Sequence, residues 1–391
     1  MISFDEAYAI VMKNARLLGT ETVELRDALH RILAQEVCAD SDIPPFDKSA
    51  MDGYACRGAD LPGPFRVIEV VQAGATPQKT VGPGECAKIM TGAMISDGAD
   101  QVLMLEDTDT DAEGLVCITR PSKKSHIRYK GEDAHTGEVL LRPGAKLGPQ
   151  HLATLATVGC VQPVVARRPR VGIIATGDEL VEPHETPGLS QIRTSNSHQI
   201  RGHAESTGAL TTYYGIARDE EAAIEAALRR AEAENDVVLL SGGVSKGDFD
   251  FVPTIMAKVG FEILFDAIAL KPGKPTTFAV SSKACCFGLP GNPVSTFVQC
   301  GILVKPFLYA LMGHAYRMPQ SWLPLGEEFR DRAAGRETWV PVRITTDNTV
   351  LRCEYHGSAH VTGLCESDGF VVIPQGTDLI EKGSLVCVRS I

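Results

Sequence analysis

The sequence predicts a multidomain protein that combines a doubly wound α/β domain with β-rich regions. Its 391 residues exceed what a single compact core usually holds. Between residues 170 and 317, short apolar runs alternate with segments of helical length, which is typical of βαβ units and a parallel sheet covered on both faces. On either side of this stretch, short Val-, Ile- and Leu-rich runs separated by Gly and Pro indicate strands and turns.

The first elements are expected to be helical. Ser3 and Glu6 have the spacing of a capping box, and the amphipathic stretch after them predicts a helix to about Leu18. A second helix is predicted over Leu25–Glu36. From Ser41 to about Gly144 the pattern becomes β-rich, with strands predicted at Arg66–Val71, Cys86–Met90, Gln101–Leu105 and Val116–Arg120.

Helical periodicity returns at Pro149–Val158, ahead of the α/β stretch. There the predicted strands are Arg170–Thr176, Val237–Ser241 and Ala284–Leu289, and the predicted helices are Ser195–Thr207, Asp219–Glu234 and Pro293–Met312. After Pro319, turn residues separate the predicted strands of a small β-barrel or sandwich, at Thr338–Ile344, Thr349–Tyr355, Phe370–Pro374 and Ser384–Arg389.

Charge and composition exclude several classes of function. With 49 acidic and 38 basic side chains, the net charge of −11 argues against nucleic-acid binding. The 11 cysteines show no metal-ligand spacing and suggest reduced thiols. The N-terminus has no signal-peptide pattern, and the most apolar segment contains Lys305 and Pro306, so we expect a buried helix, no membrane association and a cytoplasmic location.

Three polar, Gly-rich segments follow the three predicted strands of the α/β stretch. They are TGDEL (176–180), SGGVSKGDFD (241–250) and GLPGNP (288–293). Since parallel sheets bind ligands beyond the carboxyl ends of their strands, we expect these loops to converge on one crevice. Gly242 and Gly243 would let backbone N–H groups approach a phosphate, although the loops could also be simple tight turns. The absence of GxxxxGK[ST] and GxGxxG argues against a P-loop NTPase or a dinucleotide dehydrogenase.

Charged side chains lie in the same segments. Carboxylates beside a phosphate site favour Mg²⁺, and the candidates are Asp178, Glu179, Asp248 and Asp250. The alternative is that they only cap helices. Lys271 and Lys274 bracket Pro-Gly in KPGKP and are expected to face an anion.

The β-rich stretch before the α/β domain contains three further polar clusters. Asp52 lies in FDKSAMDGYA, Thr91 in IMTGA, and Arg128 and Asp133 in RYKGED. Asp52-Gly53 could also be only a hairpin turn. No GxSxG elbow is present, so a serine-hydrolase triad is not expected.

These motifs, in this order and together with TSN, ALKPGKP and GLPGNPVS, resemble the MoeA family of molybdopterin molybdenumtransferases, which includes the E domain of gephyrin. The resemblance covers nearly the whole chain. It implies insertion of molybdate into adenylylated molybdopterin with release of AMP, dependent on a divalent cation such as Mg²⁺. It also implies a homodimer whose cleft lies between two subunits.

The resemblance further implies a division of the chain into four parts. These are a discontinuous helical linking domain (1–45 and 140–169), an inserted β-rich domain (46–139), a MogA-like α/β domain (170–317) and a C-terminal β-barrel (318–391). A MogA-type adenylyltransferase and molybdoenzyme maturation factors become the candidate partners.

Residues that match family positions are carried over individually. On the inserted side of the cleft they are Asp52, Thr91, Arg128 and Asp133. On the MogA-like side they are Glu179, Asp219, Gly242, Gly243, Ser245, Asp250, Lys271, Lys274, Pro290 and Pro293, with Ser358 from the C-terminal domain. We expect Asp52 and Glu179 to act as metal ligands or general acid/base groups, Asp178 and Asp248 to assist at the metal, and Asp250 to orient the pterin.

The chain departs from the family pattern at a basic residue that often precedes KPGK, where it has Asp266 and Ala267. This either reduces the positive charge of the oxyanion site or moves that charge elsewhere. Two other functions stay open: a non-catalytic cofactor-binding scaffold of the gephyrin type, and a hydrolase acting on a nucleotide pyrophosphate. The carboxylates at 52, 133, 179 and 250 favour catalysis over a scaffold.

Overall fold

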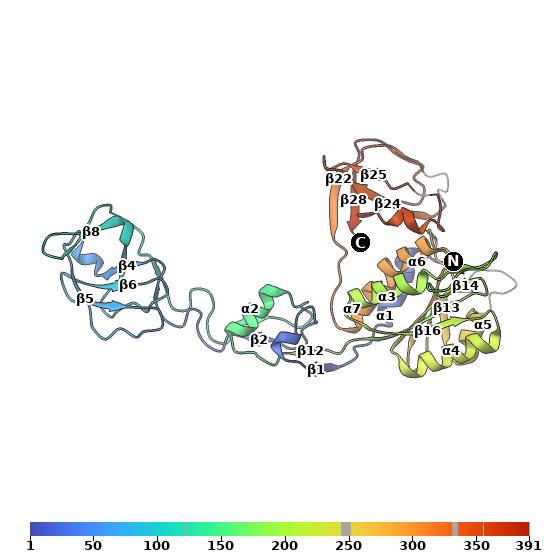
Figure 1. Ribbon diagram of the computed structural model, residues 1–391, viewed down its shortest axis with the longest axis horizontal. Coiled ribbons are helices and arrows are strands. Elements are labelled where there is room, and N and C mark those ends of the chain that lie inside the picture. Colours follow the sequence, from blue (N-terminus) through green and yellow to red (C-terminus); the bar gives the residue numbers. More distant parts are fainter. Residues whose placement is uncertain (122, 244–251, 331–334, 355, 391) are drawn as a thin grey trace.

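The computed structural model describes residues 1–121, 123–243, 252–330, 335–354 and 356–390. Figure 1 shows an elongated molecule. The inserted region (residues 46–139) lies at one end, and the α/β region (170–317) and C-terminal region (318–391) lie together at the other. Helix α2 (Pro149–Thr157) and short strands connect them, so the inserted region is far from the α/β sheet of its own chain.

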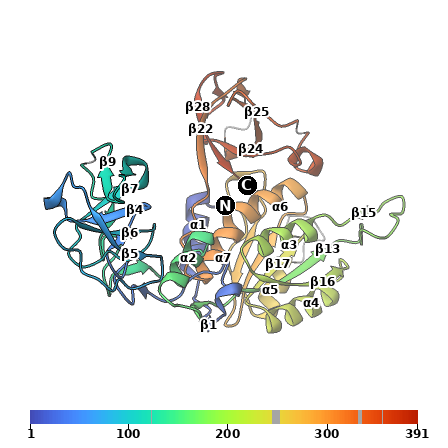
Figure 2. The ribbon, with the colours of Figure 1, turned by 60° about the vertical axis from the view of Figure 1, so that its left-hand side comes forward.

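The N-terminal helix α1 spans Phe4–Lys13 and begins with the predicted capping box. The Glu6 N–H donates to Ser3 Oγ at 3.2 Å, and the Ser3 N–H donates to the Glu6 carboxylate at 2.8 Å. Ala7 and Val11 are fully buried on one face and belong to the same hydrophobic cluster as the α/β sheet. Helix α1 therefore packs with the α/β region (Figure 2).

The prediction of a helix over Leu25–Glu36 is wrong. Only a 3₁₀ turn at Leu25–Asp27 forms, and His30 has a φ of 64°. The backbone that follows pairs with distant chain: the Leu33 N–H donates to Ala145 O at 2.8 Å, and the Ala34 N–H donates to Val164 O at 2.9 Å. These long-range hydrogen bonds satisfy the backbone better than a short isolated helix would. The short strands here are β1 (Thr20–Thr22), β2 (Val37–Cys38), β11 (Val139–Leu141) and β12 (Val164–Ala166).

The inserted region is built around a four-stranded sheet with the order β5-β6-β4-β7. The three strands predicted here in this sheet are confirmed within a residue or so, and the sheet comprises β4 (Gly53–Cys56), β5 (Arg66–Val71), β6 (Glu85–Ile89) and β7 (Gln101–Met104). Shorter pairs surround it, namely β3 (Lys48–Ser49) with β10 (Ile127–Arg128), and β8 (Thr108–Thr110) with β9 (Val116–Ile118). Gly53 pairs within β4, so Asp52-Gly53 is not a hairpin tip.

The α/β region contains a six-stranded sheet with the order β16-β13-β17-β21-β20-β18. Its strands are β16 (Leu210–Ala217), β13 (Arg170–Thr176), β17 (Val237–Ser241), β21 (Cys285–Leu289), β20 (Thr277–Val280) and β18 (Glu262–Phe265). The first four are mutually parallel, but β20 runs antiparallel to both of its neighbours, β21 and β18, so the expectation of a parallel sheet is only partly right. The short turn at 281–284 between β20 and β21 allows only an antiparallel pair.

Helices cover both faces of this sheet, as predicted (Figure 2). One face is buried by α3 (Asn196–Ser206), α6 (Pro293–Gln299) and α7 (Lys305–Leu311), and the other by α4 (Glu221–Glu234) and α5 (Val252–Val259). A π-helical turn at Cys300–Val304 joins α6 and α7. Among the described residues, this continuous Pro293–Leu311 helix alone is long and apolar enough to cross a membrane, and 78% of its apolar window is buried inside the protein.

The C-terminal region forms a second six-stranded sheet. Its order is β19-β24-β26-β28-β22, with β25 paired to β24. The strands are β22 (Gln320–Pro324), β24 (Glu337–Ile344), β25 (Val350–Arg352), β26 (Gly369–Ile373) and β28 (Leu385–Ser390), and a separate pair joins β23 (Phe329–Arg330) to β27 (Leu379–Ile380). Strand β19 (Leu270–Lys271) comes from the α/β region and pairs in parallel with β24. The KPGKP loop is therefore fixed to the C-terminal sheet.

Candidate active site

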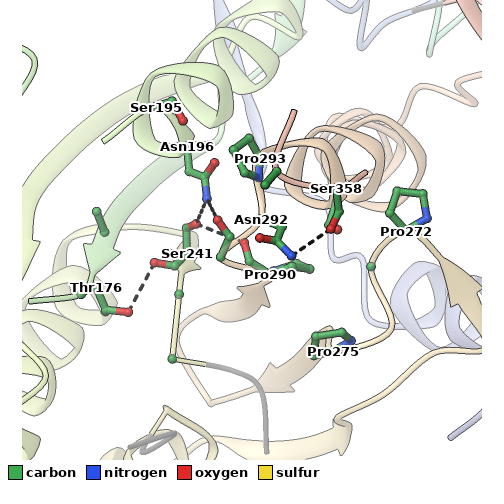
Figure 3. A pocket seen from close by; sticks show the side chains of 18 of the residues that line it. Thr176, Ser195, Asn196, Ser241, Pro272, Pro275, Pro290, Asn292, Pro293 and Ser358 are labelled. Carbon is green, nitrogen blue, oxygen red and sulfur yellow. Dashed lines mark hydrogen bonds between the residues drawn. The ribbon is translucent and has the colours of Figure 1, made fainter. Parts of the chain in front are cut away.

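A cavity of about 820 Å³ lies at the carboxyl ends of the parallel strands. The described parts of the three Gly-rich segments converge there, including residues 241–243 of the second one, and Figure 3 shows residues from all three around one space. Of the predicted site residues, it is lined by Glu179, Asp219, Gly242, Gly243, Lys271, Lys274, Pro290, Pro293 and Ser358.

The end of β13 presents two neighbouring carboxylates differently. Glu179 lines the cavity and is exposed to solvent. Asp178 instead accepts the Asp219 N–H at 3.3 Å, and Asp219 accepts the Asp178 N–H at the same distance. This reciprocal pair ties the end of β13 to the end of β16. Asp178 thus binds loop backbone in the structure, but it is not the helix cap considered as the alternative, because Asp219 precedes Glu220, the N-cap of α4.

The end of β17 brings backbone close to the cavity. Gly242 has a φ of 102°, and a Cβ atom there would lie 2.5 Å from Thr176 O. Only glycine fits this combination of left-handed backbone and close approach. The Gly242 N–H donates to Leu289 O at 3.2 Å, so the backbone already uses it. The neighbouring Gly243 also lines the cavity, and it has no side chain to shield its peptide group from a ligand. A backbone N–H in this position suits a phosphate oxygen.

The KPGKP loop is anchored by hydrogen bonds to the carbonyl of its central glycine, Gly273. Gly273 O accepts the Thr276 hydroxyl at 2.9 Å and the Gln299 side-chain amide at 3.0 Å. Both donors are fully buried. Lys271 and Lys274 both line the cavity on either side of this anchored carbonyl, so the loop presents two cationic side chains from a fixed base.

The GLPGNP loop is joined to the C-terminal region. Asn292 Nδ2 donates to Ser358 Oγ at 2.9 Å, and the Val294 N–H donates to Ser358 O at 3.0 Å (Figure 3). Pro290 and Pro293 flank this contact and line the cavity. Ser358, carried over from the family pattern, is thereby brought to the same site as the Gly-rich loops.

Arg336 is a cavity residue that the sequence analysis missed. It immediately precedes β24, and pairing of β24 with β19 brings it beside Lys271. Arg336 Nη1 donates to Leu270 O at 3.4 Å. The only sequence signal for Arg336 was the absence of a basic residue before KPGKP. The sequence does not show which distant strand pairs with that loop.

The inserted region places Asp52 and Thr91 in direct contact. Asp52 Oδ1 accepts the Thr91 N–H at 2.6 Å and the Thr91 hydroxyl at 2.7 Å. These hydrogen bonds lower the pKa of Asp52 from its ordinary value of 3.8, because they stabilise the ionised carboxylate. Both residues are exposed, so an ionised carboxylate is held on the surface rather than in a cavity of this chain.

Arg128 and Asp133 lie on the second polar segment of the inserted region and are also exposed. Arg128 Nη1 lies 2.6 Å from Glu132 Oε1. That carboxylate has a lowered pKa, firstly through the Tyr129 N–H and secondly through Arg128. The structure therefore gives Arg128 an intramolecular partner, and none of the inserted-region candidates lines the cavity of the same chain.

Some predicted residues cannot be placed. Ser245, Asp248 and Asp250 lie outside the described residues. In the part of the chain that the structure describes, no three His, Cys, Asp or Glu side chains are grouped as metal ligands. Glu179 and Asp219 are the carboxylates that line the cavity, and one or two carboxylates together with substrate phosphates are the usual Mg²⁺ ligands.

Family models match three segments of the chain. The models described as "MoeA N-terminal region (domain I and II)", "Probable molybdopterin binding domain" and "MoeA C-terminal region (domain IV)" match residues 2–159, 172–310 and 324–391. Together these segments cover nearly the whole sequence, in the same order as the motifs.

Curated relatives and solved structures agree with these matches. A protein named molybdopterin molybdenumtransferase from Bacillus subtilis is 34% identical, over 99% of this chain and 93% of the relative. One with the same name from Staphylococcus aureus is 34% identical, over 98% of this chain and 94% of the relative. The crystal structure of a molybdopterin biosynthesis moeA protein from Pyrococcus horikoshii is similar at a TM-score of 0.87 and 29% identity, with both chains fully covered.

Proposed function

Because the chain belongs to the MoeA family of molybdopterin molybdenumtransferases, we propose that it inserts molybdate into adenylylated molybdopterin and releases AMP. The protein is thus a transferase of molybdenum cofactor biosynthesis. The observation that carries the proposal is the cavity itself, where Gly-rich loops, two lysines and two arginines, Arg193 and Arg336, surround about 820 Å³.

The charges around the cavity suit the proposed substrates. Adenylylated molybdopterin carries a phosphoanhydride and molybdate is a dianion, while the protein has a net charge of −11. Lys271, Lys274 and Arg336 concentrate positive charge at the cavity against this background. Fixed cations in a partly enclosed site stabilise an oxyanion more than surface cations do. We propose that these three residues bind molybdate and that the backbone at Gly243 binds the phosphates.

A divalent cation fits the carboxylates present. Glu179 would hold Mg²⁺, with Asp219 on the same wall, and the ion would supply Lewis-acid polarisation of the phosphoanhydride. The protein's own residues would orient the two substrates and exclude water from the phosphoanhydride of the adenylylated molybdopterin. As part of this proposal we also expect the reaction to occur in the cytoplasm, consistent with the 11 free cysteines, and a MogA-type adenylyltransferase to supply the substrate.

The inserted region is proposed to act on the cavity of a second subunit. The inserted region, which contains Asp52, Thr91 and Arg128, lies at the opposite end of the molecule from the α/β region (Figure 1), whose loops line the cavity. This separation supports a homodimer in which each inserted region faces the partner's cavity. The lowered pKa of Asp52 favours a role as a metal ligand or electrostatic group, because a carboxylate of low pKa is a weak general base at neutral pH.

The decisive experiment supplies adenylylated molybdopterin, molybdate and Mg²⁺ and follows AMP and metal-loaded cofactor together. We expect both products to appear in equal amounts and at equal rates. AMP without metal-loaded cofactor would identify a pyrophosphate hydrolase. Tight binding of the pterin nucleotide with neither product would identify a scaffold. Lys274→Ala tests the cavity, and Lys382→Ala, at an exposed lysine of the C-terminal region, is the matched control.

A further inference from the structure

The side chain of Asn196 connects two of the loops that form the cavity. It is the first residue of α3, and its Nδ2 atom donates to Ser241 Oγ and to Gly291 O, both at 2.8 Å (Figure 3). Ser241 ends β17, and Gly291 lies in the GLPGNP loop after β21. Both hydrogen atoms of one amide therefore hold two loops at a fixed spacing.

Gln199, one turn along α3, fixes the orientation of this amide. Its Nε2 atom donates to Asn196 Oδ1 and to Pro293 O, both at 2.9 Å. A flipped Asn196 would direct its oxygen at Gly291 O and its nitrogen at a donor, so only one orientation satisfies all partners. The acceptor and both donors of Asn196 are thus used by the protein.

The network extends to a third strand end. The Ser241 hydroxyl donates to Pro290 O at 3.4 Å, and Ser241 O accepts the Thr176 hydroxyl at 3.4 Å. The ends of β13, β17 and β21 are consequently linked through neutral groups alone. The KPGKP loop is anchored separately, by Thr276 and Gln299.

We infer that Asn196 is a positioning residue for the transfer reaction, holding the Gly242–Gly243 and GLPGNP backbones at the spacing that binds the nucleotide-linked pterin. This inference rests on the proposed function. Because the cationic loop has its own anchor, loss of the Asn196 amide displaces the pterin-binding loops and leaves the molybdate-binding residues in place. The two substrates should therefore respond differently.

The test compares Asn196→Ala with Asn235→Ala. Asn235 is a matched control because its Nδ2 also donates two hydrogen bonds, to Tyr214 Oη and Ala231 O, and it precedes the opposite end of β17. For N196A we expect kcat/KM for adenylylated molybdopterin to fall about 10- to 100-fold, the usual cost of a misplaced reactant. The KM for molybdate should stay unchanged. N235A should lower the melting temperature and leave both constants unchanged.

Asn196→Asp removes the donors but keeps the acceptor for Gln199, so it should lose as much activity as N196A. Full activity of N196D, or equal losses for both substrates in N196A, would overturn the inference. Hydrogen exchange of full-length protein without substrate gives a second test. Amides of Gly242, Gly243 and Gly291 should exchange faster in N196A than in N235A, and equal rates would overturn the inference. This measurement does not depend on turnover, whereas an inactive wild type refutes only the proposed function.

Discussion

The cavity of the α/β region and the Asp52–Thr91 pair of the inserted region are built in different ways. The cavity is formed by loops from many parts of the chain, each held by buried or part-buried donors such as Thr276, Gln299 and Asn196. The Asp52–Thr91 pair lies exposed beside the ends of the inner strands β4 and β6 and has two hydrogen bonds. The first can bind a ligand on its own, whereas the second needs a facing surface to become a site.

The largest expected effect tests the isolated carboxylate. Asp52→Asn keeps the shape of the side chain but removes its charge, so we expect AMP release to fall at least about 100-fold, within the range for loss of a catalytic group. The melting temperature near neutral pH should fall only slightly, because Asp52 is exposed and the asparagine oxygen can still accept from Thr91. Asp111→Asn, at another exposed aspartate of the same region, is the control. Wild-type turnover of D52N would remove the inserted region from the reaction.

The next effect concerns the sheet beneath that carboxylate. In Gly53→Ala the new Cβ would lie 1.9 Å from Leu103 O, so β4 and β7 must separate. We expect a loss of about 3 kcal/mol in local stability, as for severe overpacking, measured by hydrogen exchange of β4 and β6 amides. Gly114→Ala, where no atom lies within 4 Å of the new Cβ, should cost about 1 kcal/mol for its left-handed backbone. Equal costs would show that the close contact relaxes freely.

A substitution in the cavity is expected to have a smaller effect on the reaction than the substitution of Asp52. Lys274→Ala removes one of the four cationic side chains that line the cavity, so the KM for molybdate should rise about tenfold, equivalent to about 1.4 kcal/mol. The KM for adenylylated molybdopterin should change less, because the Gly-rich backbone is intact. Steady-state kinetics with each substrate varied in turn measures both constants. Equal increases would show that Lys274 has no specific contact with the oxyanion.

The smallest expected effect is a change in the pKa of Asp52. Thr91→Val removes the hydroxyl donor to Asp52 and keeps the backbone donor, so the pKa of Asp52 should rise toward 3.8. Because the folded-state pKa is depressed in the wild type, the stabilisation is present above the unfolded pKa and is lost as pH falls through the folded value. The variant should therefore lose this stabilisation at a higher pH. Carboxyl NMR titration measures the shift, and an unmoved pKa would assign it to the backbone donor alone.

Local patterns predicted the parts of the fold that local chain determines. Strands β13 and β17 have the predicted bounds, because continuous apolar runs flanked by turn residues are unambiguous. The segment Leu25–Glu36 failed because its backbone hydrogen bonds lie with residues far along the chain. The antiparallel β18 and β20 were missed for a similar reason, since their runs are short and no periodicity indicates direction.

The candidate site likewise contains residues that the sequence could predict and residues that it could not. Glu179 could be predicted because it lies just after a predicted strand, and Lys271 and Lys274 because they bracket Pro-Gly in KPGKP. Arg336 could not, since only the pairing of β19 with β24 brings it to the cavity. Asn196 is a common helix-start residue by sequence, and its two distant acceptors become visible only in the folded chain.

The contribution of Ser358 and Arg336 to the cavity has a consequence for synthesis of the protein. A nascent chain that has emerged only as far as residue 318 contains every strand of the α/β sheet but lacks both residues. Such a chain already contains Lys271 and Lys274, but not the C-terminal residues that line the cavity with them. The complete lining of the cavity therefore exists only after Ser358 has been synthesised, and a product truncated before Arg336 lacks part of the proposed anion site.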